Sequence, residues 1–264
     1  MKQTVLKNHR KVVTSNATSR VAAKKSRHMV SMAYANLRKS ILEGTLGPGQ
    51  PLSQVQLARQ FGVSRGPLRE AIRMLQGDGL VETQVNHRAR VAPFSIDDLE
   101  HLYAMRIVYE SLAIQVSVPR FVQSDVHKLR GLLQRMDGLV GQDLRQWRIV
   151  HRDFHFALIG TVGERMTRTI RELYDHTDRY RSLYIREVPF ALPIEAGEHK
   201  RIVDSCAKYD GTEAAENLAR HLARTALTVL AHHAPAHDPT IVRAALMMAT
   251  GDDSAATRVN VKMR

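Results

Sequence analysis

The chain has 264 residues, which is enough for two domains that each bury a core of their own. Its single cysteine, Cys206, excludes an internal disulfide framework, and no apolar run approaches the roughly 18 to 20 residues of a membrane span. The 39 lysine and arginine residues against 26 aspartate and glutamate residues give a formal net charge of +13, which favours a polyanionic partner.

The first segment of the chain is strongly basic. Residues 1–28 contain eight lysine or arginine residues and neither acidic nor aromatic residues, so we expect residues 1–30 to form a flexible tail. The tail either attracts DNA phosphates without sequence preference or is simply solvated. Residues 31–46 follow, in which Leu37, Ile41 and Leu42 have helical spacing, and they predict the first helix of a domain that covers residues 31–93.

Residues 53–75 have the pattern of two short helices joined by a tight turn. Apolar residues at positions 55, 57, 58 and 61 give the first helix one apolar side, and Gly62 supplies the turn. Ser64 is the expected N-cap of the second helix. Pro67 falls in the first turn of that helix, where its missing N–H breaks no helical hydrogen bond.

The second of these helices separates apolar from basic residues. An apolar stripe lies along one side, and Arg65, Arg69 and Arg73 repeat every fourth residue on another. Two short helices of this kind, the second with a row of arginines, predict a helix-turn-helix with its DNA-reading helix. The alternative is an ordinary helical pair with a solvated arginine face.

A basic hairpin is expected after the arginine helix. Gly77 and Gly79 end the helix, because glycine tolerates the left-handed conformation found at helix ends. Residues 80–83 and 89–91 then predict two short strands. The tip between them carries His87 and Arg88, which would reach a DNA groove or a phosphate, as in a winged helix-turn-helix.

Residues 53–75 resemble the N-terminal domain of GntR-family transcription regulators, and most of all the FadR-like branch with its motif V-S-R-T-P-V-R-E-A-L. The resemblance implies that arginines of the reading helix contact operator DNA and that the wing enters the minor groove. Val55 stands where the family often has an arginine, and Arg88 stands where the wing tip commonly has a glycine. The residues assigned to DNA binding are Ser64, Arg65, Gly66, Arg69, Arg73, His87 and Arg88.

The remainder of the chain is helical in its periodicity, with no alternation typical of a sheet. Six helices are predicted, at residues 96–118, 124–140, 143–160, 164–185, 193–209 and 212–232. Short connections between them predict an antiparallel six-helix bundle over residues 96–234, so the fold class is mostly α. Residues 235–264 are expected to form a C-terminal tail that contains one more helix, at residues 239–249. The order resembles the FCD effector domain of FadR-like regulators.

Histidines carry the chemistry of the predicted bundle. His151 and His155 lie four residues apart on one helical face, a spacing that lets both bind one ion. In metal-binding FCD domains the pattern is D-x-x-F-H, then E-H, then a histidine on the last helix, and the resemblance implies that His155, His199 and His221 are ligands. His151 stands where the family usually has aspartate, and we take it as the fourth ligand.

Four neutral imidazoles would leave a divalent ion with its full charge, which favours an anionic effector such as a carboxylate. Nitrogen ligands suit zinc or nickel better than calcium or magnesium. Arg106 is the candidate for the effector carboxylate, because a guanidinium offers that group a two-pronged fit. Two alternatives to the metal site stay open: some of the 13 histidines could fall at these positions by chance, or the pocket could hold only an organic acid. The alternative to an effector role for Arg106 is an ion pair with Glu110.

The sequence therefore predicts a ligand-responsive DNA-binding transcription regulator, most simply a repressor. We expect a cytoplasmic, nucleoid-associated bacterial homodimer that binds a palindromic operator and senses a small carboxylate, a divalent metal or both. It is not expected to be an enzyme or a membrane protein. The alternative is a metal-dependent hydrolase in which Asp153 or Glu198 acts as general base, although the chain lacks an HExxH signature.

Overall fold

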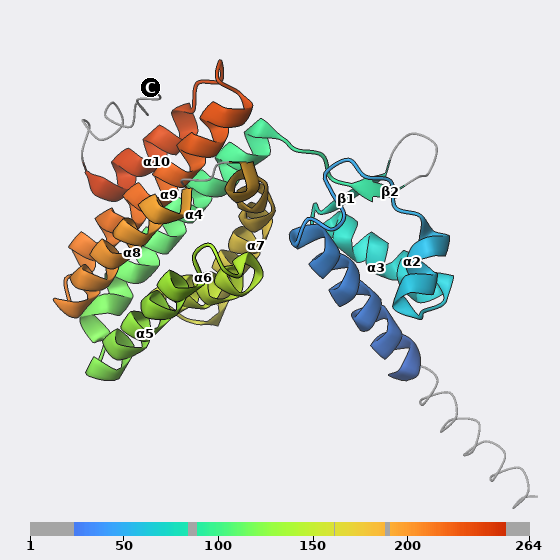
Figure 1. The fold of residues 1–264 in the computed structure, drawn as a ribbon, viewed down its shortest axis with the longest axis horizontal. Helices are drawn as coiled ribbons and strands as arrows, with labels where there is room; N and C mark the ends of the chain where they lie inside the picture. Colours follow the sequence, from blue (N-terminus) through green and yellow to red (C-terminus); the bar gives the residue numbers. More distant parts are fainter. Residues whose placement is uncertain (1–23, 84–88, 161, 188–190, 252–264) are drawn as a thin grey trace, which may run out of the picture. The chain divides into compact units, whose positions relative to one another are not determined.

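The computed structural model describes residues 24–83, 89–160, 162–187 and 191–251 (Figure 1). The chain divides between Phe94 and Ser95 into two compact units, and each is described by itself below. In the described residues no helix combines the length and the apolar character needed to cross a membrane.

The N-terminal unit is a winged helix-turn-helix. Its elements are a helix over residues 24–42, α2 Gln54–Phe61, α3 Arg65–Gly77, β1 Val81–Thr83 and β2 Ala89–Val91. The two strands lie side by side (Figure 1) and pair antiparallel. Val81 lies opposite Val91. The two helices, the turn and both strands were predicted, and these predictions are confirmed.

The first helix begins earlier than predicted. It already includes residue 24, so the boundaries expected for the tail (1–30) and for the helix (31–46) were wrong. Met29, Ala33, Leu37 and Ile41 recur every fourth residue, and all four contact the core of this unit. Because the apolar side extends upstream of residue 31 and still packs against the core, the helix extends upstream as well.

The turn between α2 and α3 depends on glycine. Gly62 ends α2 with φ at 65°, a left-handed conformation that glycine adopts without strain. Ser53 caps α2 by accepting a hydrogen bond from the Gln56 N–H. Ser64 is the N-cap residue of α3, as predicted, although its side chain makes no capping hydrogen bond.

The C-terminal unit is a bundle of α-helices. Its elements are α4 Ile96–Ser117, the short 3-10 turn η1 Val118–Arg120, α5 Gln123–Leu139, α6 Leu144–Leu158, α7 Glu164–Glu187, α8 Ala191–Ala207, α9 Gly211–His233 and α10 Thr240–Thr250. All six predicted bundle helices are present. Pro193 was expected to be the first residue of α8, but the helix begins at Ala191, so Pro193 lies within its first turn, where a proline breaks no helical hydrogen bond.

The last helix, α10, belongs to the bundle rather than to a tail. It packs against α4 and α9 (Figure 1). Its side chains Val242 and Leu246 are buried. The carboxylate of Glu100 on α4 accepts hydrogen bonds from the N–H groups of Ile241 and Val242 at its start. Among the described residues the bundle therefore has seven α-helices instead of the six predicted.

Candidate functional site

The arginine side of α3 faces solvent. Arg65 and Arg69 are exposed and form no hydrogen bond or ion pair with any residue that the structure describes. Leu68, Ala71 and Leu75 are fully buried on the opposite side of the helix. Two guanidinium groups are thus held on a rigid helix with all their donors available for an anionic partner.

Arg73 is differently placed from the other two arginines. Its guanidinium donates to Glu70 on the preceding turn, with a shortest N–O distance of 2.7 Å. Ser64 and Gly66 lie exposed at the start of α3, where the free N–H groups of a helix attract a phosphate. His87 and Arg88, predicted at the wing tip, lie outside the described residues.

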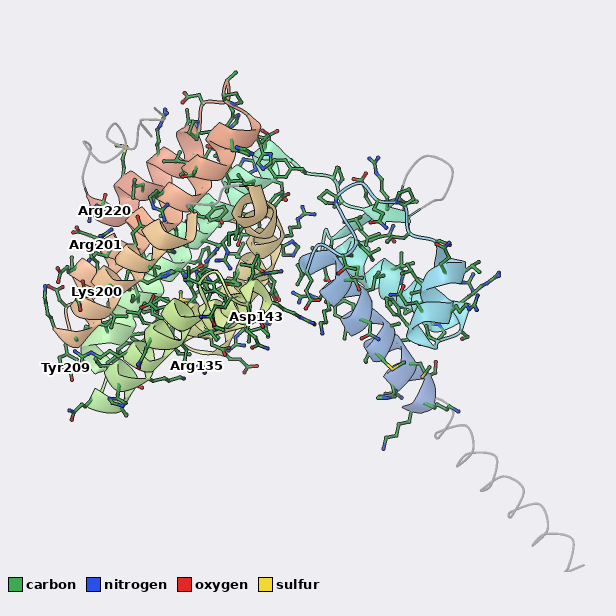
Figure 2. All side chains as sticks on the ribbon, viewed as in Figure 1. Arg135, Asp143, Lys200, Arg201, Tyr209 and Arg220 are labelled. Atoms are coloured by element: carbon green, nitrogen blue, oxygen red, sulfur yellow. The ribbon has the colours of Figure 1, made fainter. Side chains whose placement is uncertain are left out.

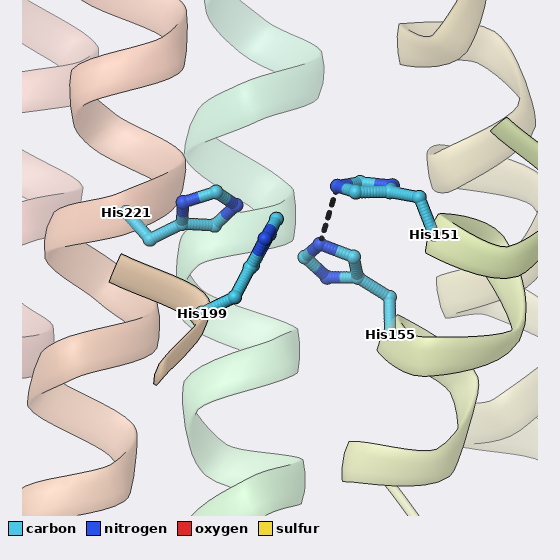
Figure 3. Close-up of side chains that lie close together, drawn as sticks. All are labelled: His151, His155, His199 and His221. Atoms are coloured by element: carbon cyan, nitrogen blue, oxygen red, sulfur yellow. Dashed lines mark hydrogen bonds between the residues drawn. The ribbon is translucent and has the colours of Figure 1, made fainter. Parts of the chain in front are cut away.

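The four predicted histidines meet inside the bundle (Figure 3). His151 and His155 project from α6, His199 from α8 and His221 from α9. All four are at least 97% buried, and one ring nitrogen from each lies within 4.8 Å of the others. Helices that are far apart in the sequence therefore supply one compact set of nitrogen ligands.

The spacing of these nitrogens suits a transition metal. The Nε2 atoms of His151 and His155 are 3.2 Å apart, close to the roughly 3.4 Å that separates ligands bonded to one tetrahedral ion. Nε2 of His199 is fully buried without a hydrogen-bond partner among the described residues. A buried nitrogen with no partner is unfavourable unless it binds a ligand, so the residues present fit a divalent ion.

Two of the imidazoles are oriented by a hydrogen bond on the second nitrogen, and a third faces a carboxylate. Nδ1 of His221 lies 2.9 Å from a Glu198 oxygen. Nδ1 of His155 faces a Glu110 oxygen at 3.5 Å, without a hydrogen-bond partner among the described residues. Nδ1 of His151 lies 2.8 Å from the hydroxyl of Tyr174. Metal-bound histidines commonly have such a partner on the second nitrogen, because it fixes the tautomer and leaves the other nitrogen for the ion.

The environment keeps three of the imidazoles neutral. Burial, together with the nearby cation of Arg181, lowers the pKa of His151 well below its ordinary value, and burial likewise lowers the pKa of His199. The pKa of His155 falls to about 3, because burial outweighs its attraction to Glu110. A neutral imidazole is the form that binds a metal, so these ligands need not lose a proton near pH 7.

Arg106 is held by its neighbours in the bundle. It is 3% exposed, its Nε donates to Glu110 at 2.5 Å, and it also donates to Thr177 at 2.9 Å. Burial tends to raise the pKa of Glu110, but Arg106 lowers it to about 2, so the carboxylate stays ionised. The ion-pair alternative is therefore formed, and through Glu110 it positions His155. An effector role for Arg106 remains a prediction.

A further arginine, Arg181 on α7, lies at the histidine cluster and was not singled out from the sequence. Its side chain is 97% buried, with one guanidinium nitrogen 3.1 Å from Nε2 of His151. Asp178 accepts a hydrogen bond from it at 3.0 Å, and its guanidinium carbon lies 5.2 Å from the centre of the Trp147 ring. No local sequence signal distinguishes it from other arginines of this helix.

Glu198→Gln is expected to weaken metal binding by about 10- to 100-fold, because it removes the charge that orients and polarises His221. Competition with a chromogenic chelator would measure the change. Glu216→Gln on α9 is the matched control, since Glu216 pairs only with Arg220 at the surface among the described residues. Equal affinities for the two variants would contradict a supporting role for Glu198.

Comparison with known proteins identifies the two units. Residues 29–91 match the family described as bacterial regulatory proteins, gntR family, and residues 101–224 match the FCD domain. The HTH-type transcriptional regulator BphR of Paraburkholderia xenovorans (strain LB400) is 32% identical over 204 residues, which cover 74% of this chain and 83% of the relative. The chain belongs to the GntR family of transcriptional regulators.

Other relatives of this GntR regulator have the same organisation. The HTH-type transcriptional repressor GlaR of Escherichia coli (strain K12) is 26% identical over 199 residues, which cover 72% of this chain and 90% of the relative. The solved structure of E. coli McbR/YncC has the same fold, with a TM-score of 0.68 at 20% identity over 78% of this chain and 98% of that one. The FCD domain agrees with the predicted FadR-like branch. These comparisons give no support to the hydrolase alternative.

Proposed function

We propose that this GntR regulator senses a small organic carboxylate at a divalent transition metal, zinc or nickel, held by His151, His155, His199 and His221. The observation that carries the proposal is the burial of four imidazoles around one point, beside a buried arginine. When bound, the ion would supply a positive charge that attracts the carboxylate.

The charges around the cluster support an anionic effector. Each carboxylate next to the histidines is already paired: Glu110 with Arg106, Glu198 with Arg224, and Asp178 with both Arg148 and Arg181. Those carboxylates therefore leave the charge of a divalent ion uncompensated. Burying that charge is unfavourable, so an anion that joins it is stabilised.

Arg181 is the proposed second anchor for the effector. Nδ1 of His151 donates a hydrogen bond to the hydroxyl of Tyr174, so Nε2 carries no proton and has one lone pair. In the structure this lone pair accepts a hydrogen bond from Arg181. When that lone pair binds an ion, the Arg181 N–H groups must turn to another acceptor. A carboxylate on the ion would supply one, since guanidinium and carboxylate match in shape and charge.

A homodimer is supported by the outer face of α4. An α-helix that is apolar on all sides is normally buried on all sides, yet α4 leaves five apolar side chains 37–48% exposed at helical spacing. They are Met105, Val108, Tyr109, Leu112 and Val116. A second copy of the chain would cover this face, and two arginine helices would then bind a palindromic operator.

Carboxylate binding would change the affinity of the dimer for its operator by coupling within the chain. Repression is the simplest outcome, as in the relatives named as repressors, such as GlaR and a probable D-xylose utilization operon repressor of Paenarthrobacter nicotinovorans. A regulator of this kind would act in the cytoplasm, on the nucleoid.

The test begins with an operator selected from random DNA, to which metal-loaded protein is bound. Acetate, lactate and citrate are then titrated against the complex in a gel-shift assay. Arg181→Met should raise the carboxylate concentration for half-maximal response by about 10- to 100-fold, in line with the loss of one buried charge-assisted contact. The metal content should not change.

Arg220→Met is the matched control, because Arg220 pairs with Glu216 on the outer side of α9. It should respond to the carboxylates like the unmodified protein. A response of Arg181→Met equal to that of the control would remove Arg181 from the proposal. The absence of any carboxylate or metal effect on DNA binding would contradict the sensing function as a whole.

A further inference from the structure

We propose that a groove between α5, α6 and α7 is a second effector site, which binds a phosphorylated small molecule. The groove has a volume of about 670 Å³, within the range of roughly 300–1,000 Å³ typical of small-molecule sites. It is separate from the histidine cluster: Asp153 and Phe156 line it from α6, whereas His151 and His155 lie buried in the bundle.

Three cations surround the groove. Lys128 and Arg135 lie seven residues apart on one side of α5, and Arg171 comes from α7. Arg135 is marked in Figure 2. Lys128 and Arg135 are exposed and form no ion pair or hydrogen bond with any described residue, so their charges are not satisfied within the bundle. Unpaired cations that converge on a concavity favour an anionic ligand.

The groove is also shaped to admit a ligand. Gly131 lies on α5 between Lys128 and Arg135, and a Cβ built there would meet nothing within 4 Å. Glycine inside a helix reduces helix stability relative to alanine, but here it leaves the groove open. Phe156 and Leu132 supply apolar surface, and the Arg171 guanidinium carbon lies 4.5 Å from the centre of the Phe156 ring.

The charge balance of the groove indicates the class of ligand. Asp153 is the carboxylate in the lining, so three cations face one anion, which matches a phosphomonoester that carries nearly two negative charges. Asp153 would repel a phosphate but accept a hydrogen bond from a hydroxyl group. The three cations and Asp153 therefore fit a sugar phosphate better than a DNA backbone, which presents phosphates without hydroxyl donors.

Isothermal titration calorimetry on the full-length, metal-loaded protein tests the proposal, with ribose 5-phosphate and inorganic phosphate as probes. Arg135→Gln/Arg171→Gln should weaken ribose 5-phosphate binding by at least tenfold, because two phosphate contacts are lost. Gly131→Leu should weaken it to a similar extent by filling the groove without changing its charge. Arg130→Gln, an exposed arginine on α5 outside the groove, is the control and should bind normally.

Three outcomes would overturn the proposal. Equal binding by Gly131→Leu and the unmodified protein would show that the phosphate does not enter the groove. Loss of phosphate binding in His199→Ala, with normal binding in the arginine variant, would place the anion at the histidine cluster. The third outcome is that the arginine variant binds random-sequence duplex DNA more weakly but binds ribose 5-phosphate normally. The cations of the groove would then be DNA contacts.

Discussion

Arg69→Ala is expected to weaken specific operator binding by about 10- to 100-fold, because an arginine that contacts a base edge contributes roughly 1–3 kcal/mol. Arg69 projects from the middle of α3 into solvent and has no partner among the described residues, so its loss removes DNA contacts without leaving a buried group unsatisfied. Gel-shift titration on the selected operator would measure the change. The thermal unfolding midpoint should stay close to that of the unmodified protein.

Arg73→Ala is the matched control on the same helix. Arg73 is paired with Glu70, so its loss should cost less affinity and should affect specific and random DNA to a similar extent. Equal affinities of Arg69→Ala and the unmodified protein would contradict the assignment of α3 as the DNA-reading helix. A larger loss for Arg73→Ala than for Arg69→Ala would shift the reading contacts toward the end of α3.

The second large effect is expected for His199→Ala, which should lose most of its bound metal. Nε2 of His199 is buried and has no hydrogen-bond partner among the described residues. Changes to groups that only orient metal ligands typically reduce affinity about 10- to 100-fold, so removal of a direct ligand should reduce it further. Elemental analysis of protein dialysed against excess zinc or nickel would report the metal-to-protein ratio.

His101→Ala is the control for this experiment, because His101 is exposed on α4 and lies outside the cluster. It should retain about one ion per chain, as the unmodified protein is expected to do. If neither the unmodified protein nor either variant retains metal, the cluster does not bind an ion. Two alternatives from the sequence would then remain, a pocket for an organic acid alone and a chance placement of the histidines.

Local signals in the sequence were sufficient to predict the helices, the turn and the strands of the DNA-binding unit. Pro67 restricts the backbone at its own position, and Gly62 and Gly79 adopt positive φ values that glycine tolerates, so the turn, the start of α3 and its end could be predicted without knowledge of the neighbours. The apolar stripe of the first helix extends upstream of residue 31 to Met29, so this part of the helix is also visible in the sequence.

Local sequence signals also predicted part of the histidine cluster. His151 and His155 share a helical face by their spacing alone, whatever packs against that face. Their meeting with His199 and His221 was expected only from a resemblance to FCD domains. The structure brings the four together because α8 and α9 pack beside each other and present these side chains to α6.

By itself, the sequence determined the class of the two units, the arginine side of α3 and the pair of histidines on α6. These follow from periodicity and from residues whose backbone preferences are local. The tertiary structure alone decided that Arg106 pairs with Glu110, that Arg181 lies against His151, and that α10 completes the bundle. Helical periodicity indicates which side of a helix is buried, but the packing of the whole chain decides which neighbouring helix covers that side.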